Sequence, residues 1–337
     1  MDIYSVPEHY SPPPERYDSM LYRRCGGSGI KMSAVSLGFW HNFGDMDSYA
    51  NARQVTRTAF SAGVNSFDLA NNYGPAYGSA EENFGRMMKD DFAPFRDELF
   101  ISSKAGYDMW PGPFGVGGSR KYLLASLDQS LKRMKLDYVD VFYHHCMDAQ
   151  TPLEESMSAL AHAVRAGKSL YAGISNYSPE QAAKAFDLLK AEGVPCLIEQ
   201  SAYNMLNRDP EGGLFGALEK YGVGFAAYSP LAQGILSGKY NKEIPKESRA
   251  GGYSKFLSSS NLTGGVLDKL RVLGEVADGR GQSMAQLALA WLLNNPLVTT
   301  VIVGASRAEQ LLENIKAIER ITFSREEILK IEEATNQ

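Results

Sequence analysis

Short apolar runs alternate with longer amphipathic segments along most of the chain. Each run ends in polar or small residues, as buried strands of a parallel sheet do. The segments between the runs have helical periodicity and are long enough to return the chain to the same end of a sheet. We therefore predict strands at 35–38, from 64, and at 99–104, 138–143, 170–174, 196–200, 223–228 and 300–303.

Helices are predicted between these strands, at 48–62, 79–89, 119–134, 152–166, 179–192, 213–221 and 307–318. Several helix starts match the capping box, in which Ser or Thr and a Glu or Gln three residues later satisfy free N–H groups. These pairs are Ser79 with Glu82, Thr151 with Glu154, Ser178 with Gln181, Ser283 with Gln286, Ser306 with Glu309 and Ser324 with Glu327. Pro152 and Pro179 are expected at the first helical position, where a missing N–H costs nothing.

Eight strand–helix units in one chain favour a single α/β domain, a (β/α)8 TIM barrel, over a doubly wound sheet. A glycine-centred β-hairpin is expected at 21–32. A long insertion after the seventh strand, residues 229–282, includes a helix at 266–277, and an extra C-terminal helix is predicted at 324–335. We divide the chain into an N-terminal arm, residues 1–20, and a barrel domain, residues 21–337.

Composition narrows the classes of function. The 337 residues carry a formal net charge of −5, so no basic field attracts nucleic acid or an anionic membrane. No apolar run reaches the roughly 18 residues of a membrane span, and neither a GxGxxG fingerprint nor a Walker A sequence is present. Cys25, Cys146 and Cys196 lie far apart, which indicates a reducing compartment. We expect a cytoplasmic protein.

Polar side chains gather where the predicted strands end. In a barrel of this class the carboxyl ends of the strands surround the active site. The residues at these ends are Trp40, Asp68 with Tyr73, Lys104, His144 with His145, Ser175 with Asn176, Gln200, Tyr228 and 304–307. They predict one polar site at a single end of the barrel.

Four of these residues, Asp68, Tyr73, Lys104 and His145, can make a proton-donating site. A free phenol titrates near pH 10 and is a poor acid at neutral pH. The ammonium of Lys104 would favour the phenolate, and Asp68 would hold that ammonium in place. His145 could donate a hydrogen bond to a carbonyl oxygen or relay a proton. An acid aimed at a developing alkoxide is what carbonyl reduction requires.

The motifs and their order resemble the aldo-keto reductase superfamily. The similar stretches are 67–74, 101–104, 136–145, 173–177, 228–234 and 304–307, with Glu313 and Asn314. Within it, residues 40–44, 104–113 and 281–286 most resemble the bacterial L-glyceraldehyde 3-phosphate reductases, relatives of the potassium-channel β subunits. The resemblance implies NADPH-dependent reduction of short polar aldehydes or ketones, with L-glyceraldehyde 3-phosphate or a methylglyoxal-like compound as the best guess.

The resemblance also implies residue roles, with Tyr73 as general acid and Asp68, Lys104 and His145 completing a tetrad. NADPH is implied to lie extended across the barrel mouth. Its implied contacts are Trp40, Asp68, Ser175, Asn176, Gln200, Tyr228, Ser229, Pro230, Leu231, Ala232, Gln233, Gly234, Lys239, Gly304, Ser306, Arg307, Gln310, Glu313 and Asn314. A cation at a helix start, such as Arg307, is unfavourable without an anion, which supports a phosphate there. Substrate contacts are expected from Trp40, His41, Tyr73, Trp110 and His145.

Other interpretations stay open. The His144-His145-Cys146 sequence suggests a metal site, but successive strand residues point to opposite faces and no third ligand has suitable spacing. We expect no metal and a packing role for His144.

A second class of function is an NADP-binding regulatory subunit like the channel β subunits. His145 argues against this class, because those proteins are expected to have asparagine at this position. A third is an alcohol or sugar dehydrogenase working oxidatively. The resemblance also implies a homo-oligomer, for which a tetramer and an octamer both stay open.

Overall fold

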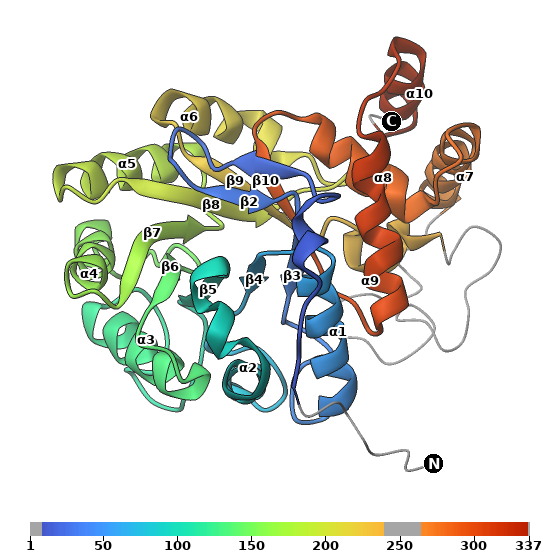
Figure 1. The fold of residues 1–337 in the computed structure, drawn as a ribbon. Helices are drawn as coiled ribbons and strands as arrows, with labels where there is room; N and C mark the ends of the chain where they lie inside the picture. The colour runs from blue at the N-terminus through green and yellow to red at the C-terminus, as the bar shows by residue number, and fades with distance from the viewer. Residues whose placement is uncertain (1–8, 239–263, 336–337) are drawn as a thin grey trace.

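Eight parallel strands close into a barrel in the computed structural model, which describes residues 9–238 and 264–335 (Figure 1). Around the barrel they are β10 (Val298–Val303), β3 (Val35–Gly38), β4 (Ser66–Asp68), β5 (Phe100–Ala105), β6 (Val139–His144), β7 (Ser169–Ser175), β8 (Cys196–Ala202) and β9 (Gly224–Tyr228). Each strand pairs in parallel with the next along the chain, and β10 closes the ring against β3. The predicted (β/α)8 barrel is confirmed.

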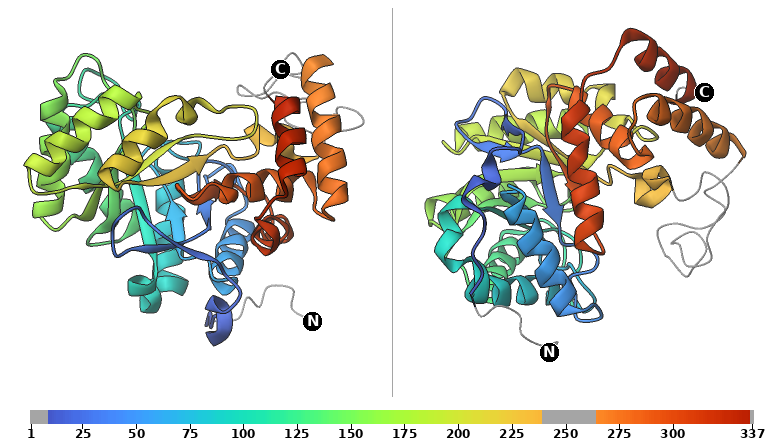
Figure 2. Two further views of the ribbon diagram at one scale, coloured as in Figure 1. Left: turned by 90° about the horizontal axis from the view of Figure 1, so that it is seen from above. Right: turned by 45° about the vertical axis from the view of Figure 1, so that its right-hand side comes forward.

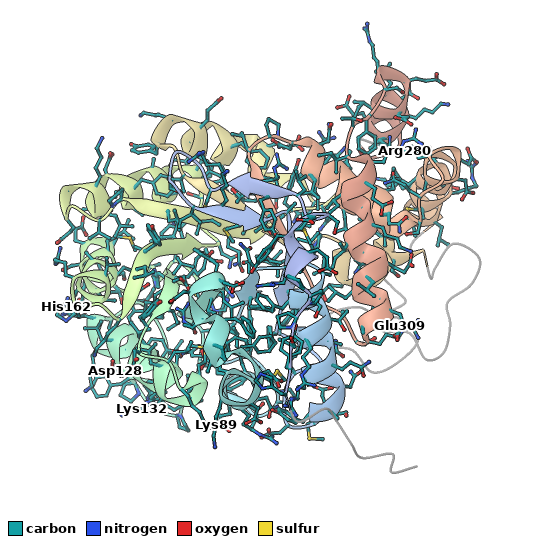
Figure 3. All side chains as sticks on the ribbon, viewed as in Figure 1. Lys89, Asp128, Lys132, His162, Arg280 and Glu309 are labelled. Carbon is teal, nitrogen blue, oxygen red and sulfur yellow. The ribbon has the colours of Figure 1, made fainter. Side chains whose placement is uncertain are left out.

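Helices cover the outside of the strands (Figure 1). They are α1 (Tyr49–Ser61), α2 (Ser79–Met87), α3 (Arg120–Met134), α4 (Leu153–Arg165), α5 (Pro179–Ala191), α6 (Leu214–Tyr221), α8 (Met284–Asn294) and α9 (Ala308–Ile315). On α1 the buried residues Ala52, Val55 and Ala59 repeat at helical spacing. Charged side chains such as Asp128 and Lys132 on α3 lie at the periphery (Figure 3). The amphipathic pattern thus sets which face of each helix meets the barrel.

Half of the predicted capping boxes occur in the structure. Those of Ser178, Ser283 and Ser324 have both reciprocal hydrogen bonds. The other three predictions are wrong, because Gly78, Pro152 and Arg307 occupy the N-cap positions. A serine or threonine displaced by one residue cannot reach the N–H groups of the first turn. Pro179 begins α5 as predicted, whereas Pro152 precedes α4 by one residue.

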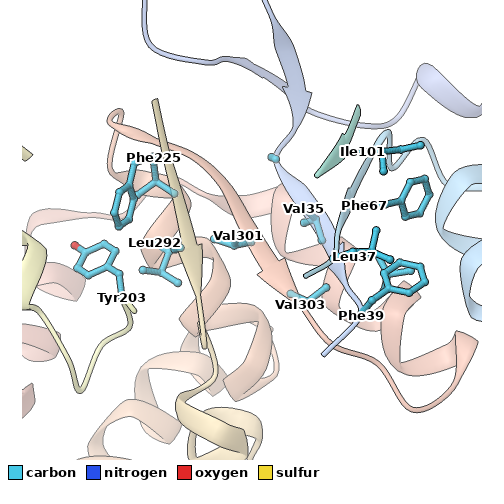
Figure 4. Close-up of a cluster of buried hydrophobic side chains, with 14 of the residues drawn as sticks. Val35, Leu37, Phe39, Phe67, Ile101, Tyr203, Phe225, Leu292, Val301 and Val303 are labelled. Atoms are coloured by element: carbon cyan, nitrogen blue, oxygen red, sulfur yellow. The ribbon is translucent and has the colours of Figure 1, made fainter. Parts of the chain in front are cut away.

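Apolar side chains fill both the barrel interior and the layer beneath the helices. Figure 4 shows part of the layer beneath the helices. The rings of Phe39 and Phe67 meet edge to face at 6.1 Å, and Tyr203 and Phe225 do so at 6.0 Å. Inside the barrel, Val141 and Tyr143 alternate with residues that face the helices. This close packing makes the strands a rigid support for the side chains at their ends.

The predicted hairpin is confirmed and covers the end of the barrel opposite to the carboxyl ends. Its strands are β1 (Tyr22–Arg24) and β2 (Lys31–Ser33), paired antiparallel. The Gly27 N–H donates to the Gly222 carbonyl, 2.8 Å away, just before β9 begins. Gly26 has φ +52°, and a Cβ there would lie 2.2 Å from the same carbonyl, so no other residue fits.

Two helices extend the plain barrel. The insertion helix α7 (Gly264–Gly279) and the C-terminal helix α10 (Arg325–Thr335) lie side by side at one edge (Figure 2). The predicted helices at 266–277 and 324–335 are therefore confirmed, whereas most of the Ser- and Gly-rich stretch 248–265 lies outside the described residues. No helix in the described ranges has the length and apolar character that a membrane crossing requires.

The described part of the N-terminal arm lies along α1. The Tyr10 hydroxyl donates to the Arg57 carbonyl at 2.9 Å, and its ring packs edge-on against Phe92 at 5.4 Å. Met20 is buried in the main core. Residues 10–20 are thus attached to the barrel, while the division of the chain at residue 20 stays a prediction.

Candidate active site

A cleft of about 740 Å³ lies at the carboxyl ends of the strands. Asp68 ends β4, Lys104 lies one residue before the end of β5, and His145 follows β6. Tyr73 comes from the loop after β4. Asp68, Tyr73 and His145 line the cleft, and Lys104 is fully buried against Tyr73. The structure therefore brings together the four side chains predicted as a tetrad.

The ammonium of Lys104 is surrounded by oxygen atoms. Nζ donates to Asp68 Oδ2 and to the Leu69 carbonyl, both at 2.7 Å, and to the Tyr73 hydroxyl at 3.1 Å. A lysine without access to solvent is stable only with such partners. Lys104 is consequently fixed next to the phenol oxygen that would lose a proton.

Asp68 is held in turn by two side chains that approach its other oxygen. Oδ1 accepts from Ser102 Oγ at 2.8 Å and from Gln200 Nε2 at 2.9 Å. These bonds come from β5 and β8, on two sides of the carboxylate. Rotation of the carboxylate would break one of them, so the direction of its bond to Lys104 is set.

Burial controls the protonation state of Tyr73. The surrounding protein disfavours a phenolate and holds the pKa of Tyr73 well above its ordinary value, and the Asp68 carboxylate adds to this rise. The net direction of the Tyr73 pKa is therefore upward, and the expected effect of Lys104 on the phenolate stays a prediction. Tyr73 keeps its proton at neutral pH, and the nearby ammonium is placed to stabilise the phenolate once the proton leaves.

His145 is uncharged at neutral pH. Burial first, and the Lys104 ammonium second, hold its pKa well below the ordinary value. Its Nδ1 is buried and has no hydrogen-bond partner among the described residues. The rings of Tyr73 and Tyr107 lie edge-on at 5.9 and 4.7 Å. A neutral imidazole in the cleft wall favours the hydrogen-bonding role over proton relay.

Asn176 connects the ends of four strands around the cleft. Its φ is +61°, and its Nδ2 donates to the His145 carbonyl and to Ser175 Oγ, both at 3.0 Å. Its Oδ1 accepts from the Tyr228 hydroxyl at 2.8 Å. Ser175 Oγ donates to the Gln200 carbonyl at 2.6 Å. Asn176, Gln200 and Tyr228 line the cleft, whereas Ser175 is buried behind them.

Aromatic side chains complete the wall near Tyr73 and His145. Trp40 and His41 line the cleft, as predicted, with ring centroids 4.2 Å apart. Trp110 does not line it but packs on Tyr122, with ring centroids 5.1 Å apart. The structure therefore offers no support for the predicted contact between Trp110 and substrate.

Nine lining residues were not predicted, namely Gly38, Asn42, Asn72, Tyr77, Tyr107, Asp108, Ser237, Ile302 and Val303. Most of them lie in loops, whose path the hydrophobic pattern does not set. A usable signal was present for Tyr107 and Asp108, because they follow the end of β5 by two and three residues. The Tyr77 hydroxyl donates to Asp108 Oδ2 at 3.0 Å and joins the loops after β4 and β5.

His144 lies outside this arrangement. It is buried, and its Nδ1 shares a hydrogen bond with the Tyr177 hydroxyl at 2.5 Å. Burial lowers its pKa to about 4. His144 therefore has the packing role that strand alternation predicts.

Sequence comparison places this geometry in a known family. The model of the aldo/keto reductase family matches residues 34–336. The chain belongs to this family. It is an oxidoreductase of the aldo-keto reductase type.

Two named groups of aldo-keto reductase relatives match nearly the whole chain. Proteins named L-glyceraldehyde 3-phosphate reductase from Escherichia coli O157:H7 and strain K12 are 57% identical over 324 residues, 95% of this chain and 94% of theirs. A probable voltage-gated potassium channel subunit beta from Arabidopsis thaliana is 39% identical over 308 residues, 90% of this chain and 92% of its own.

Aldo-keto reductases use NAD(P)H, and the cleft offers groups that fit a nicotinamide cofactor. Asn176 and Gln200 present amide groups that can pair with a carboxamide, and the partly buried ring of Tyr228 lies beside them. The lining continues after β9 through Ser229, Pro230, Leu231, Gln233 and Gly234, whereas Ala232 lies in the same turn but does not line the cleft.

Residues after β10 fit the other end of a dinucleotide in part. Gly304, Ser306 and Gln310 line the cleft, whereas Arg307, Glu313 and Asn314 do not. Asn314 is buried with no partner for its Nδ2 among the described residues, and such a donor is normally satisfied by a ligand or water. Lys239 lies outside the described residues.

Proposed function

We propose that this aldo-keto reductase reduces the carbonyl group of short polar aldehydes and ketones to an alcohol with NADPH. The observation that carries the proposal is the Tyr73 hydroxyl, 3.1 Å from the buried Lys104 ammonium, in a cleft that His145 also lines. The first substrates to test are L-glyceraldehyde 3-phosphate, which the names of the E. coli relatives contain, and methylglyoxal.

The protein side of the reaction uses each member of the tetrad differently. A nicotinamide cofactor held in the cleft would supply the hydride that reduction of the carbonyl carbon requires. Tyr73 gives its hydroxyl proton to the carbonyl oxygen as negative charge develops there. Lys104 stabilises the phenolate left behind, and Asp68 keeps the ammonium in place. Neutral His145 donates a hydrogen bond to the same oxygen and orients the substrate.

The preference for NADPH over NADH is supported by the loop before α9. The free N–H groups at the start of a helix and its dipole favour a phosphate. Arg307 at the N-cap of α9 adds a cation beside Ser306, which lines the cleft. Reduction rates with the two cofactors at equal concentration test this part of the proposal, and faster turnover with NADH would contradict it.

Replacement of one hydroxyl group tests the general acid. Tyr73→Phe removes the proton and keeps the ring, so turnover of every aldehyde is expected to fall at least about 1,000-fold. NADPH binding, measured by fluorescence titration, should change less than about twofold, because Tyr73 is assigned to proton transfer and not to the cofactor.

Tyr221→Phe is the matched control. Its hydroxyl donates to Asp187 on the helical layer, away from the cleft, and its loss should leave turnover unchanged. Equal turnover by Tyr73→Phe and the unaltered protein would refute the acid assignment. No turnover of any short aldehyde by the unaltered protein would count against the proposed function itself.

A regulatory role like that of the channel β subunits is a second candidate, since such proteins are among the relatives. The neutral His145 beside a protonated Tyr73 favours an enzyme. Recovery of a membrane channel in a pull-down, together with negligible reductase activity, would reverse this ranking.

The third candidate, an alcohol or sugar dehydrogenase that works oxidatively, is tested by adding alcohols and NADP and measuring NADPH formation. Cytoplasmic location and a homo-oligomeric state stay predictions, the latter tested by light scattering.

A further inference from the structure

Asp108 brings a negative charge to the part of the cleft where a substrate would lie. It lines the cleft with Tyr107, whose ring contacts the His145 ring at 4.7 Å. Among the described residues, no lysine or arginine belongs to the lining. The Asp108 carboxylate therefore has no basic side chain of the described lining beside it.

Tyr77 fixes the direction of the Asp108 carboxylate. Its hydroxyl donates to Oδ2 at 3.0 Å, and both side chains line the cleft. Tyr77 lies four residues after Tyr73 in the same loop, whereas Asp108 comes from the loop after β5. With Oδ2 engaged by Tyr77, Oδ1 keeps its capacity to accept a hydrogen bond.

We propose that Asp108 is a specificity-determining residue, which accepts a hydrogen bond from a hydroxyl group of the substrate and disfavours an anionic end. This inference rests on the proposed function and ranks its candidate substrates. Neutral hydroxyaldehydes should have the highest kcat/KM, and aldehydes without a hydroxyl group should have lower values. The carboxylate also lowers activity with phosphorylated aldehydes below the level that the rest of the cleft allows.

Both effects are large enough to measure. A hydrogen bond to a charged acceptor is about twice as strong as a neutral one, and a site with such an acceptor rejects an analogue that lacks the donor. Repulsion between two unit charges several ångströms apart near a protein surface changes binding about tenfold.

Three aldehydes distinguish the two effects through kcat/KM with NADPH: glyceraldehyde, propanal and glyceraldehyde 3-phosphate. Asp108→Asn removes the charge and keeps an acceptor, so the ratio of glyceraldehyde 3-phosphate to glyceraldehyde should rise about tenfold. Asp108→Ala removes the acceptor as well, so the ratio of glyceraldehyde to propanal should fall several-fold. Tyr77→Phe should lower only the second ratio, because it releases the carboxylate without removing its charge.

Asp137→Asn removes an equal charge just before β6 begins, at the other end of the barrel. Both ratios should stay as in the unaltered protein. Unchanged ratios in Asp108→Asn and Asp108→Ala, with turnover retained, would overturn the inference and leave the proposed function intact. If the unaltered protein reduced none of the three aldehydes, the proposed function would fail first, and this inference with it.

Discussion

Lys104 and Asp68 stabilise the fold only as a pair, because both charges lie away from water. Lys104→Met leaves the carboxylate buried without a cation and is expected to cost about 3–5 kcal/mol. Asp68→Asn combined with Lys104→Met leaves no buried charge and should regain much of that loss. Turnover should be absent from both variants. Urea unfolding gives the free energy of unfolding of the unaltered protein, the single variant and the double variant. A double variant less stable than Lys104→Met would contradict this account.

Glu199 on β8 makes stability depend on pH. Its Oε1 accepts from Ser201 Oγ at 2.6 Å, its Oε2 has no partner among the described residues, and burial raises its pKa to about 8. From about pH 4.5 to 8 the unfolded chain ionises this group while the folded protein keeps it neutral. The free energy of unfolding therefore decreases as pH rises through this window, by at most about 1.4 kcal/mol per pH unit.

Glu199→Gln should remove this dependence. The unaltered protein is expected to lose stability relative to the variant between about pH 5 and pH 7.5, by a few kcal/mol. Because the two proteins share every other titrating group, the difference between their unfolding free energies isolates the contribution of Glu199. An equal difference at both pH values would show that Glu199 is ionised in the folded protein.

At the scale of elements, two similar serines differ because one caps a helix and the other does not. Ser178 accepts from the Gln181 N–H at the start of α5, so Ser178→Ala is expected to cost about 1 kcal/mol. Ser306 precedes the N-cap of α9 and donates to Gln310 Oε1. Ser306→Ala should leave stability nearly unchanged and weaken NADPH binding. Thermal unfolding gives the stability of the two variants, and cofactor titration gives their affinity for NADPH. Equal destabilisation of the two variants would show that Ser306 caps α9.

For the molecule as a whole, Arg280 joins the C-terminal segment to the barrel. Its guanidinium donates to Glu327 Oε2 at 2.8 Å and to the carbonyls of Arg320 and Thr322, and it lies 3.8 Å from the Phe323 ring centroid. Figure 3 labels this side chain beside α10. These contacts connect Glu327 on α10, and the segment just before it, to the end of α7.

Arg280→Met should loosen α10 without loosening the barrel. We expect amide hydrogen exchange in α10 to become at least about tenfold faster, while exchange in β4–β6 stays unchanged. Arg271→Met is the control, because Arg271 pairs with Glu275 on the exposed side of α7 and such pairs contribute little. Equal exchange rates in the Arg280 variant and the unaltered protein would show that α10 is held by its apolar contacts alone.

The order of elements and the tetrad were predictable because both are local signals. Val35–Gly38 is an apolar run that ends in a small residue, and it is a strand at the same bounds in the structure. Asp68 and Lys104 each stand at the polar end of such a run, and strand ends in a closed parallel barrel necessarily meet. The sequence by itself therefore determined the barrel, the hairpin, and which charged and phenolic groups share one end.

The tertiary structure decided what depends on contacts between distant segments. The path of the loop after β5 turns Tyr107 and Asp108 into the cleft and packs Trp110 on Tyr122. The entry angle of each helix decides which neighbouring residue becomes its cap, so Arg307 takes the place expected for Ser306. The burial of Tyr73 raises its pKa, because desolvation is a property of the whole enclosing fold.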